Sequence, residues 1–256
     1  MRIGLLFPGE MGAVIGAAAR GEIAWASEGR SKATARRAQE AGFVDVGSVA
    51  ELVATSELVL SVCPPAIAED VAQEVFGLGY PGLYIEANAI TPGRMARIAQ
   101  LGDRIVDGSI LGALHFYLSG DAADVELTAG LFADSAVTAI PLEGGIGAAS
   151  ALKMAYAGWN KIGIALTAQA QAIARAHGVG EALEAEGVTG ERLPRSAAKA
   201  WRWAPEMEEI AVTCAELGLP DGIPRGAADL YRRWDGHRDT EVELDRLLDD
   251  LSVERG

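Results

Sequence analysis

The first 141 residues alternate short apolar runs with stretches of helical periodicity. One helix is expected over 31–41, with Ser31 as its N-cap. A short helix is expected to begin at Ser48, and another at about Pro92. The runs that predict strands are 3–7, 22–27, 43–46, 58–62, 83–86, 104–107, 116–120 and 136–140. Such alternation is typical of a parallel sheet with helices on both faces, so we predict an α/β, doubly wound N-terminal part.

The pattern changes after Pro141. Gly144-Gly145-Ile146-Gly147 is hinge-like, and 148–176 is one Ala-rich helical stretch that would span about 43 Å. Further helical segments are expected around Leu183 and over 194–217, 226–234 and 241–251. We therefore predict two domains, 1–143 with the parallel sheet and 144–256 all-α, with the long helix as a spine between lobes or subunits.

The chain opens with an apolar strand, a turn that contains glycine, and an Ala-rich helix, MRIGLLFPGEMGAVIG. This order is that of a dinucleotide-binding βαβ unit, in which the start of the helix faces a pyrophosphate. The usual Gly-x-Gly-x-x-Gly motif would require glycine at 7, 9 and 12, and position 7 is Phe. Gly9 still allows close approach of phosphate and Gly12 close packing of the helix, so Phe7 and Pro8 must form the tight turn. An ordinary βα turn is the alternative.

The end of the second predicted strand discriminates between the nicotinamide cofactors. An acidic residue there binds the ribose 2′-hydroxyl of NAD, whereas an arginine accommodates the 2′-phosphate of NADP. Segment 20–37 is basic although the chain has a net charge of −14, and its basic residues are Arg20, Arg30, Lys32, Arg36 and Arg37. Arg30 is placed to stack on adenine and pair with the phosphate, and Ser27 and Ser31 add hydroxyl donors. We favour NADP; Glu28 would support NAD, and Arg36 and Arg37 also fit a solvated helix face.

Loops after the later strands face the nicotinamide in folds of this class. We expect them to be Cys63-Pro64-Pro65 and 86–89, where Asn88 can donate and accept, as ribose hydroxyls require. Cys63 could be a nucleophile, but no histidine lies in its stretch, so a packing role is favoured. Asp107-Gly108-Ser109 ends the next predicted strand and is placed to touch a substrate.

The long helix carries the best catalytic residue. Lys153 is surrounded by Ala, Leu, Met and Tyr, and desolvation there would help it give a proton to a carbonyl oxygen as hydride arrives. Asn160 follows seven residues later on nearly the same helix face, and Trp159 is placed to reach the pocket. The alternative is a lysine whose charge reaches water from an apolar helix.

Composition narrows the range of partners and compartments. The net charge of −14 argues against nucleic acid or an anionic membrane as partner. Two distant cysteines, Cys63 and Cys214, favour a reducing cytoplasm, and neither a signal peptide nor a membrane-spanning run is recognisable. No metal is expected, because no cluster has metal-ligand spacing. The residues interpreted as structural, or as core and dimer packing, are His115, His177, His237, Trp201, Trp203 and Trp234.

Together these segments resemble the β-hydroxyacid dehydrogenase superfamily, which includes 6-phosphogluconate dehydrogenase and the imine reductases. More narrowly, the chain is similar to a bacterial branch with a C-terminal domain of unknown function. The matching segments are FPGEMG at 7–12, CPP at 63–65, EANAITP at 86–92, VDGSILG at 106–112, GAASALKMAYAGW at 147–159 and AWRWAPEMEEI at 200–210. The resemblance implies a Rossmann-type domain followed by an all-helical domain, which usually dimerises so that one subunit helps to close the other's site.

The resemblance also implies roles for single residues. Lys153 matches the family's catalytic lysine, Gly9 and Met11 match its pyrophosphate turn, and Gly112 aligns with a glycine of its substrate loop. Imine reductases usually replace the lysine, so its presence here favours a C=O/CH–OH couple.

One departure from the family bears on the substrate. Members that act on hydroxy acids often carry asparagines three and four residues after the lysine, where this chain has Tyr156 and Ala157. Asn160 is then a functional replacement, and the phosphogluconate activity does not transfer.

These interpretations combine into a prediction of function. We expect a cytoplasmic, homodimeric, NADPH-dependent oxidoreductase that moves hydride between nicotinamide and a small carbonyl or hydroxy-acid-type substrate. An imine reductase or reductive aminase is one alternative, and a non-catalytic NADP-binding sensor or partner subunit is another. The predicted site comprises Lys153 and Asn160 (catalytic), Pro8, Gly9, Glu10, Met11, Ser27, Arg30, Ser31, Cys63, Pro64, Pro65 and Asn88 (cofactor), and Ser109, Gly112, Tyr156 and Trp159 (substrate).

Overall fold

The computed structural model describes residues 1–252 and divides the chain into two compact units, Met1–Lys153 and Met154–Gly256. The dividing point lies inside helix α7 (Ala148–Ala176), so the glycine cluster 144–147 and the first turns of that helix belong with the N-terminal unit. The predicted domains 1–143 and 144–256 stay a prediction. Within the described chain, none of the helices has the length and apolar character needed to cross a bilayer.

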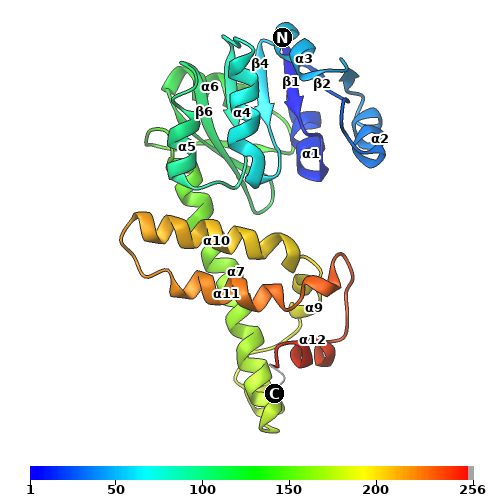
Figure 1. Ribbon diagram of the computed structural model, residues 1–256, viewed down its shortest axis with the longest axis vertical. Helices are drawn as coiled ribbons and strands as arrows, with labels where there is room; N and C mark the ends of the chain where they lie inside the picture. The colour runs from blue at the N-terminus through cyan, green and yellow to red at the C-terminus, as the bar shows by residue number, and fades with distance from the viewer. Residues whose placement is uncertain (253–256) are drawn as a thin grey trace. The chain divides into compact units, whose positions relative to one another are not determined.

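The N-terminal unit is built on one eight-stranded sheet with the order β3-β2-β1-β4-β5-β6-β7-β8 (Figure 1). All neighbouring strands are parallel except β6 and β7, which pair antiparallel. The strands are β1 (Arg2–Leu6), β2 (Glu22–Trp25), β3 (Val44–Asp45), β4 (Leu58–Ser61), β5 (Leu83–Glu86), β6 (Ile105–Leu111), β7 (His115–Gly120) and β8 (Thr138–Pro141). The predicted doubly wound sheet is therefore confirmed.

Helices cover both faces of this sheet. They are α1 (Glu10–Ala18), α2 (Lys32–Glu40), α3 (Val49–Thr55), the 3-10 turn η1 (Pro65–Ile67), α4 (Ala68–Gly77), α5 (Pro92–Ile98) and α6 (Ala122–Gly130). Ile3 and Leu5 of β1 point to the core under α1, α2 and α6, whereas Leu6 points to the core under α3, α4 and α5. Because neighbouring side chains on a strand face opposite ways, both faces of a fully buried strand must be apolar.

The predicted helix starts at Ser31 and Ser48 are confirmed. The Ser31 hydroxyl accepts a hydrogen bond from the Thr34 N–H at 3.2 Å, and Ser48 caps α3 through the Glu51 N–H at 3.1 Å. Each cap gives a partner to one N–H that the helix cannot satisfy itself.

The described part of the second unit is helical. Beyond α7 it contains α8 (Gly180–Ala185), α9 (Leu193–Ala197), α10 (Ala200–Glu216), α11 (Gly222–Arg232), the 3-10 turn η2 (Asp235–His237) and α12 (Leu244–Asp250). Buried Tyr231 of α11 packs edge-to-face on Trp203 of α10, with ring centroids 5.4 Å apart, and its hydroxyl donates to the Lys161 carbonyl of α7 at 2.6 Å. The core role predicted for Trp234 is confirmed, since it is fully buried, and Trp203 is half-buried with its ring packed on Tyr231.

Two predicted boundaries are wrong. The strand expected to end at Asp107 continues to Leu111, because β6 pairs along its whole length with β7, so Ser109 lies opposite Tyr117 inside the sheet. The single helix expected over 194–217 is two helices, because the Ala198 carbonyl accepts from the Asp239 N–H at 2.9 Å and so leaves the helical ladder.

Candidate functional site

The strand order of the N-terminal unit reverses at β1. The chain passes from β1 outward to β2 and β3, then returns to β4 on the other side of β1. In open α/β sheets, ligands bind in the crevice outside the carboxyl ends of the strands at this switch point. The segments that leave those ends are the turn 7–9 after β1 and Cys63-Pro64-Pro65 after β4, both predicted as cofactor-binding.

The turn after β1 is formed as the sequence predicts. Phe7 has φ of +64°, the left-handed conformation that the missing glycine would adopt, and its carbonyl accepts from the Gly9 N–H at 2.7 Å. Gly9 is the N-cap of α1, and Glu10 and Met11 form its exposed first turn. A Cβ at Gly12 would lie 2.5 Å from the Phe7 carbonyl oxygen, whereas one at Gly9 would meet its nearest atom at 3.9 Å. Gly12 is therefore required by the fold, and Gly9 leaves space open at the start of the helix.

A cation stacks directly on this turn. The Arg30 guanidinium carbon lies 3.5 Å from the centroid of the Phe7 ring, an arrangement that attracts a cation to the ring face. The Arg30 Nε is buried and, among residues 1–252, has no hydrogen-bond partner, and desolvation lowers the Arg30 pKa. Arg37 of α2 also reaches the turn, donating to the Pro8 carbonyl at 3.3 Å. Ser27 is half-buried after β2, and the Ser31 hydroxyl serves as the cap of α2.

A buried polar cluster lies at the carboxyl ends of β4 and β5. The Asn88 Nδ2 donates to Glu86 Oε1, to Ser61 Oγ at 3.2 Å and to Cys63 Sγ at 3.3 Å. The Asn88 Oδ1 is buried and, within the described chain, unpartnered. An unmet acceptor at this edge is the chemistry that a ribose hydroxyl would satisfy.

Burial controls the titration of this cluster. Glu86 is fully buried, and desolvation raises its pKa to about 8, with hydrogen bonds from Asn88 acting in the opposite direction. Desolvation and the Glu86 carboxyl raise the pKa of Cys63 to about 12, so the thiol is not ionised at neutral pH. This supports the packing interpretation of Cys63 over the nucleophilic one.

The N-terminal turn of α7 is fastened to β6 by one carboxylate. Asp107 Oδ2 accepts from the backbone N–H groups of Gly147 at 3.0 Å and Ser150 at 2.9 Å, and from the Ser119 hydroxyl at 3.2 Å. Asp107 Oδ1 accepts from the Ser150 hydroxyl at 2.7 Å. A negative charge at the start of a helix is favourable, and these bonds partly offset the desolvation that raises the Asp107 pKa.

Lys153 is held one turn further along α7. Its Nζ donates to the Ile110 carbonyl of β6 at 2.9 Å, and the side chain is half-buried. Strands β5 and β6 are parallel with Glu86 opposite Asp107, so Ile110 lies beyond the end of β5, at the same sheet edge as Asn88. The ammonium group is therefore at the sheet edge from which the segments predicted to bind the cofactor leave.

Ser109 does not end its strand as predicted. Its hydroxyl is buried within β6 and has no partner among the described residues, while Gly112 forms the β6–β7 turn with φ of +51°. The predicted residues Tyr156, Trp159 and Asn160 belong to the second unit. There the Tyr156 and Trp159 ring centroids are 6.0 Å apart, and Asn160 Oδ1 accepts from the Arg192 Nη2 at 3.3 Å.

Sequence reasoning missed three contributors to this arrangement. Asp107 was expected to touch a substrate and instead binds the start of α7. Glu86 was quoted within a segment without a role of its own, and Ser150 was not singled out. A carboxylate that ends an apolar strand, as in Leu83–Glu86, is the signal that could have found them, because a charge in that position must be buried with partners. Across residues 1–252, no group of three or more His, Cys, Asp or Glu side chains is arranged to hold a metal ion.

The second unit carries a match to a known sequence family. Residues 174–234 match the domain of unknown function DUF1932. No curated protein shows significant sequence similarity to the chain.

Solved structures match over the full length. A conserved protein of unknown function, itself described as similar to 3-hydroxyacid dehydrogenases, superimposes with a TM-score of 0.72 at 22% identity, covering 99% of this chain and 100% of that one. For Mycobacterium tuberculosis 3-hydroxyisobutyrate dehydrogenase the TM-score is 0.75 at 17% identity, and the match covers 98% of this chain and 99% of that enzyme. For a Myxococcus stipitatus imine reductase in complex with NADP+ the TM-score is 0.58 at 19% identity, and the match covers 97% of this chain and 100% of that enzyme. The chain thus has, over its full length, the fold of the hydroxyacid dehydrogenases and imine reductases, and its helical part carries a DUF1932 match.

Proposed function

We propose that the protein is an NADPH-dependent oxidoreductase that moves hydride between nicotinamide and a small carbonyl or hydroxy-acid-type substrate. The observation that carries this proposal is the placement of Lys153, whose Nζ is held on the Ile110 carbonyl at the carboxyl edge of the sheet. An ammonium group at that edge lies where dinucleotide-binding folds present the reactive end of the cofactor.

The residues of the N-terminal unit fit a dinucleotide. The N–H groups at the start of α1 suit a pyrophosphate, and Gly9 leaves room for it. The Asn88 Oδ1, which no described residue meets with a hydrogen bond, suits a ribose hydroxyl at the other end. Relatives of the same fold are bound to NADP+ or to NAD+.

The arginine on the phosphate turn supports NADPH over NADH. Arg30 stacks on Phe7, its buried Nε has no hydrogen-bond partner within residues 1–252, and Arg37 donates to the Pro8 carbonyl beside it. A phosphate monoester would give Arg30 the charged acceptor that it lacks, through the planar fork of donors that arginine offers.

The chemistry assigned to the chain is proton transfer. When bound, the nicotinamide supplies or accepts the hydride. When the substrate is a carbonyl that receives hydride, Lys153 polarises its oxygen or gives it a proton; when the substrate is an alcohol that loses hydride, the neutral Lys153 amine takes the hydroxyl proton. The hydrogen bond to Ile110 fixes where the Nζ points. Asn160 is the proposed second polar group of the catalytic helix. The proposed substrate contacts are Ser109, Gly112, Tyr156 and Trp159.

Substitution of Lys153 tests the proposal. A panel of small ketones, aldehydes, hydroxy acids and imines is scored for NADPH oxidation or NADP+ reduction. Lys153→Met should lower turnover by about 10²- to 10⁴-fold, the range of general acid catalysis, while the Kd for NADPH stays within about threefold. Lys199→Met, at an exposed lysine of the second unit, is the matched control and should change neither.

Three other outcomes would change the assignment. NADPH binding without turnover of any compound would favour the non-catalytic sensor or partner subunit. NADPH oxidation that requires an added amine would identify a reductive aminase. Full activity in the Lys153→Met variant would overturn the role given to the lysine.

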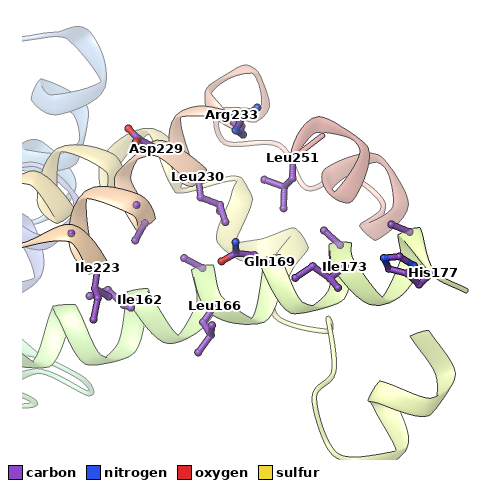
Figure 2. Close-up of a pocket in the computed structure, with 16 residues that line it drawn as sticks. Ile162, Leu166, Gln169, Ile173, His177, Ile223, Asp229, Leu230, Arg233 and Leu251 are labelled. Carbon is purple, nitrogen blue, oxygen red and sulfur yellow. The ribbon is translucent and has the colours of Figure 1, made fainter. Parts of the chain in front are cut away.

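We also propose that the protein is a homodimer. Within the second unit, α7, α11 and α12 enclose a groove of about 710 Å³ in which Leu230 and Leu251 face Gln169 and Ile173 of α7 (Figure 2). Large apolar side chains along it are open to solvent, at 65% for Leu166, 59% for Ile173 and 67% for Ile223. Contiguous apolar surface of this kind marks an interaction site, and a second copy of the chain is the partner we assign.

A charge placed in the groove tests the dimer. Leu166→Glu should convert a dimer into a monomer, measured by light scattering after size exclusion. The control, Leu217→Glu, places the same charge at an exposed leucine that does not line the groove and should leave the mass unchanged. A wild-type chain that is monomeric at micromolar concentration would contradict the assignment.

Charge and thiol chemistry support the remaining expectations. A net charge of −14 favours a small-molecule partner over nucleic acid. Both thiols, Cys63 and Cys214, are free, which supports a reducing cytoplasmic location.

A further inference from the structure

A small pocket with both polar and apolar lining lies beside α7 in the second unit. Its volume is about 220 Å³, below the roughly 300–1,000 Å³ of sites for drug-sized ligands. One wall is a stretch of α7 and the other is the segment that leads into α9. The lining residues used below are Trp159, Asn160, Ile164, Thr189, Arg192 and Leu193.

The pocket contains a cation that faces a neutral partner. The Arg192 Nη2 donates to Asn160 Oδ1 at 3.3 Å, and no carboxylate among residues 1–252 forms an ion pair with Arg192. A guanidinium has five N–H donors, so most of its capacity is unused by that bond. Because acidic residues outnumber basic ones by 36 to 22 in this chain, an arginine directed at an amide instead of a carboxylate is unusual.

The other lining residues add hydrogen-bond donors and apolar surface. With the Asn160 Oδ1 turned to Arg192, the Nδ2 of Asn160 and the Thr189 hydroxyl can both donate to an anion. Ile164 and Leu193 are buried and form an apolar base. Trp159 stands at the rim with 75% of its surface exposed, which is unusual for an indole with no ligand.

We propose that this pocket binds a small organic carboxylate. The Arg192 fork holds the carboxyl group, Asn160 Nδ2 and Thr189 complete its hydrogen bonds, and Trp159 covers the apolar or planar remainder of the ligand. A planar carboxylate matches two parallel guanidinium N–H groups, whereas the volume excludes a nucleotide. Asn160 and Trp159 are also contacts of the substrate proposed above, so the inference deepens the proposed function and rests on it, with Arg192 as the residue that holds a carboxyl group. Binding needs no nicotinamide and is measured without it.

Titration of the full-length protein with benzoate tests the inference. Calorimetry should give saturable binding at one site per chain, and quenching of tryptophan fluorescence should disappear in Trp159→Phe. Benzyl alcohol, which has the same ring without the carboxylate, should bind at least about tenfold more weakly, because hydrogen bonds to a charged group are the stronger ones. Inorganic phosphate should not compete.

Two substitutions separate the pocket from surface binding. Arg192→Gln should weaken benzoate binding at least about tenfold, and Asn160→Asp should do the same by placing a carboxylate on Arg192. The matched control is Arg195→Gln, at an exposed arginine near Glu241 that does not line the pocket and should leave binding unchanged.

The results that overturn the inference are equally specific. Equal binding of benzoate and benzyl alcohol would show an apolar site without carboxylate recognition. Competition by phosphate would show that the pocket binds anions in general and not carboxylates in particular. Equal loss of benzoate binding in the Arg195 and Arg192 variants would show non-specific attraction to positive charge. Each of these results is obtained without NADPH, and Lys153, which tests the proposed function, does not line the pocket, so failure here is distinguishable from failure of the proposed function.

Discussion

The Ser150 hydroxyl donates to Asp107 Oδ1 at 2.7 Å and so ties the first turn of α7 to β6. The same carboxylate accepts from the N–H groups of Gly147 and Ser150, which closes the helix start. Lys153 follows Ser150 by three residues, one helical turn, so both face the same strand. Asp107 therefore sets the direction in which Lys153 leaves the helix, and the Lys153–Ile110 bond depends on it.

Removal of this carboxylate should destabilise the protein. In the wild type, the donors around Asp107 are divided between two carboxylate oxygens. Asp107→Asn leaves them one oxygen and places an NH₂ group against N–H groups. We therefore expect a loss of about 2–4 kcal/mol in the free energy of unfolding. Ser150→Ala removes a single hydrogen bond to the charged group and should cost about 1–2 kcal/mol. Urea midpoints followed by circular dichroism measure both.

The matched control for these variants is Asp134→Asn. That side chain is 90% exposed and pairs with Arg20 at the surface, and asparagine tolerates its φ of +58°. The change should stay within about 0.5 kcal/mol. If Asp107→Asn were as stable as this control, Asp107 would not be what stabilises the start of α7.

Stability should fall with rising pH because of Glu86. Its pKa is about 8 in the folded protein and near 4.5 when unfolded, so between these values the folded state holds a proton that the unfolded state has released. The free energy of unfolding then decreases as pH rises through this window, by at most about 1.4 kcal/mol per unit from this group. Below about pH 4.5 the contribution is fully present, and above about pH 8 it is lost.

Glu86→Gln isolates that contribution. Glutamine keeps an oxygen for the Asn88 donors and carries no charge, so the variant should match the wild type near pH 5 and exceed it near pH 8. Unfolding curves at four pH values give the difference. The control is Glu143→Gln, at an exposed position, whose free energy of unfolding should change with pH as that of the wild type does. A difference for Glu86→Gln that does not change with pH would contradict the buried, protonated carboxyl.

Local signals were sufficient for much of the fold. The apolar run 83–86 and the Ala-rich stretch 148–176 match β5 and α7, and Ser31 and Ser48 cap the helices that they were expected to open. The departure at position 7 was also interpretable, because a turn without its glycine requires another residue in the left-handed conformation, and Phe7 adopts it. In each case the physical cause lies within a few residues of the feature.

Contacts between distant segments were beyond the same reasoning. Ser109 was expected at a strand end, yet pairing with Tyr117 on β7 extends the strand past it. The break between α9 and α10 depends on the Asp239 N–H, about 40 residues away. The stacking of Arg30 on Phe7 joins the ends of β1 and β2. No periodicity in the sequence encodes such partners, because they depend on which segments the fold brings together.

Arg30 should control the choice of cofactor. Arg30→Ala removes the guanidinium whose buried Nε lacks a partner in the described part of the chain, so we expect the Kd for NADPH to rise at least about tenfold while that for NADH changes little. Cofactor fluorescence titrations measure both constants. Arg36→Ala is the control, because Arg36 is exposed and paired with Glu40 on the same helix. Equal losses for NADPH and NADH in the Arg30 variant would assign it to adenine stacking alone.

The glycines of the first turn should separate folding from nucleotide binding. At Gly12 a methyl group would lie 2.5 Å from the Phe7 carbonyl oxygen, so Gly12→Ala should displace α1, cost about 1–3 kcal/mol and weaken NADPH binding. At Gly9 the nearest atom to the added methyl is 3.9 Å away, and φ is −68°, so Gly9→Ala should keep the stability of the wild type. It should nevertheless lower NADPH affinity strongly, because the methyl would fill the space that a pyrophosphate needs above the helix start. Urea midpoints and cofactor titrations on the two variants give four values. If Gly9→Ala bound NADPH as the wild type does, the turn after β1 would not be the pyrophosphate site, whatever Gly12→Ala showed.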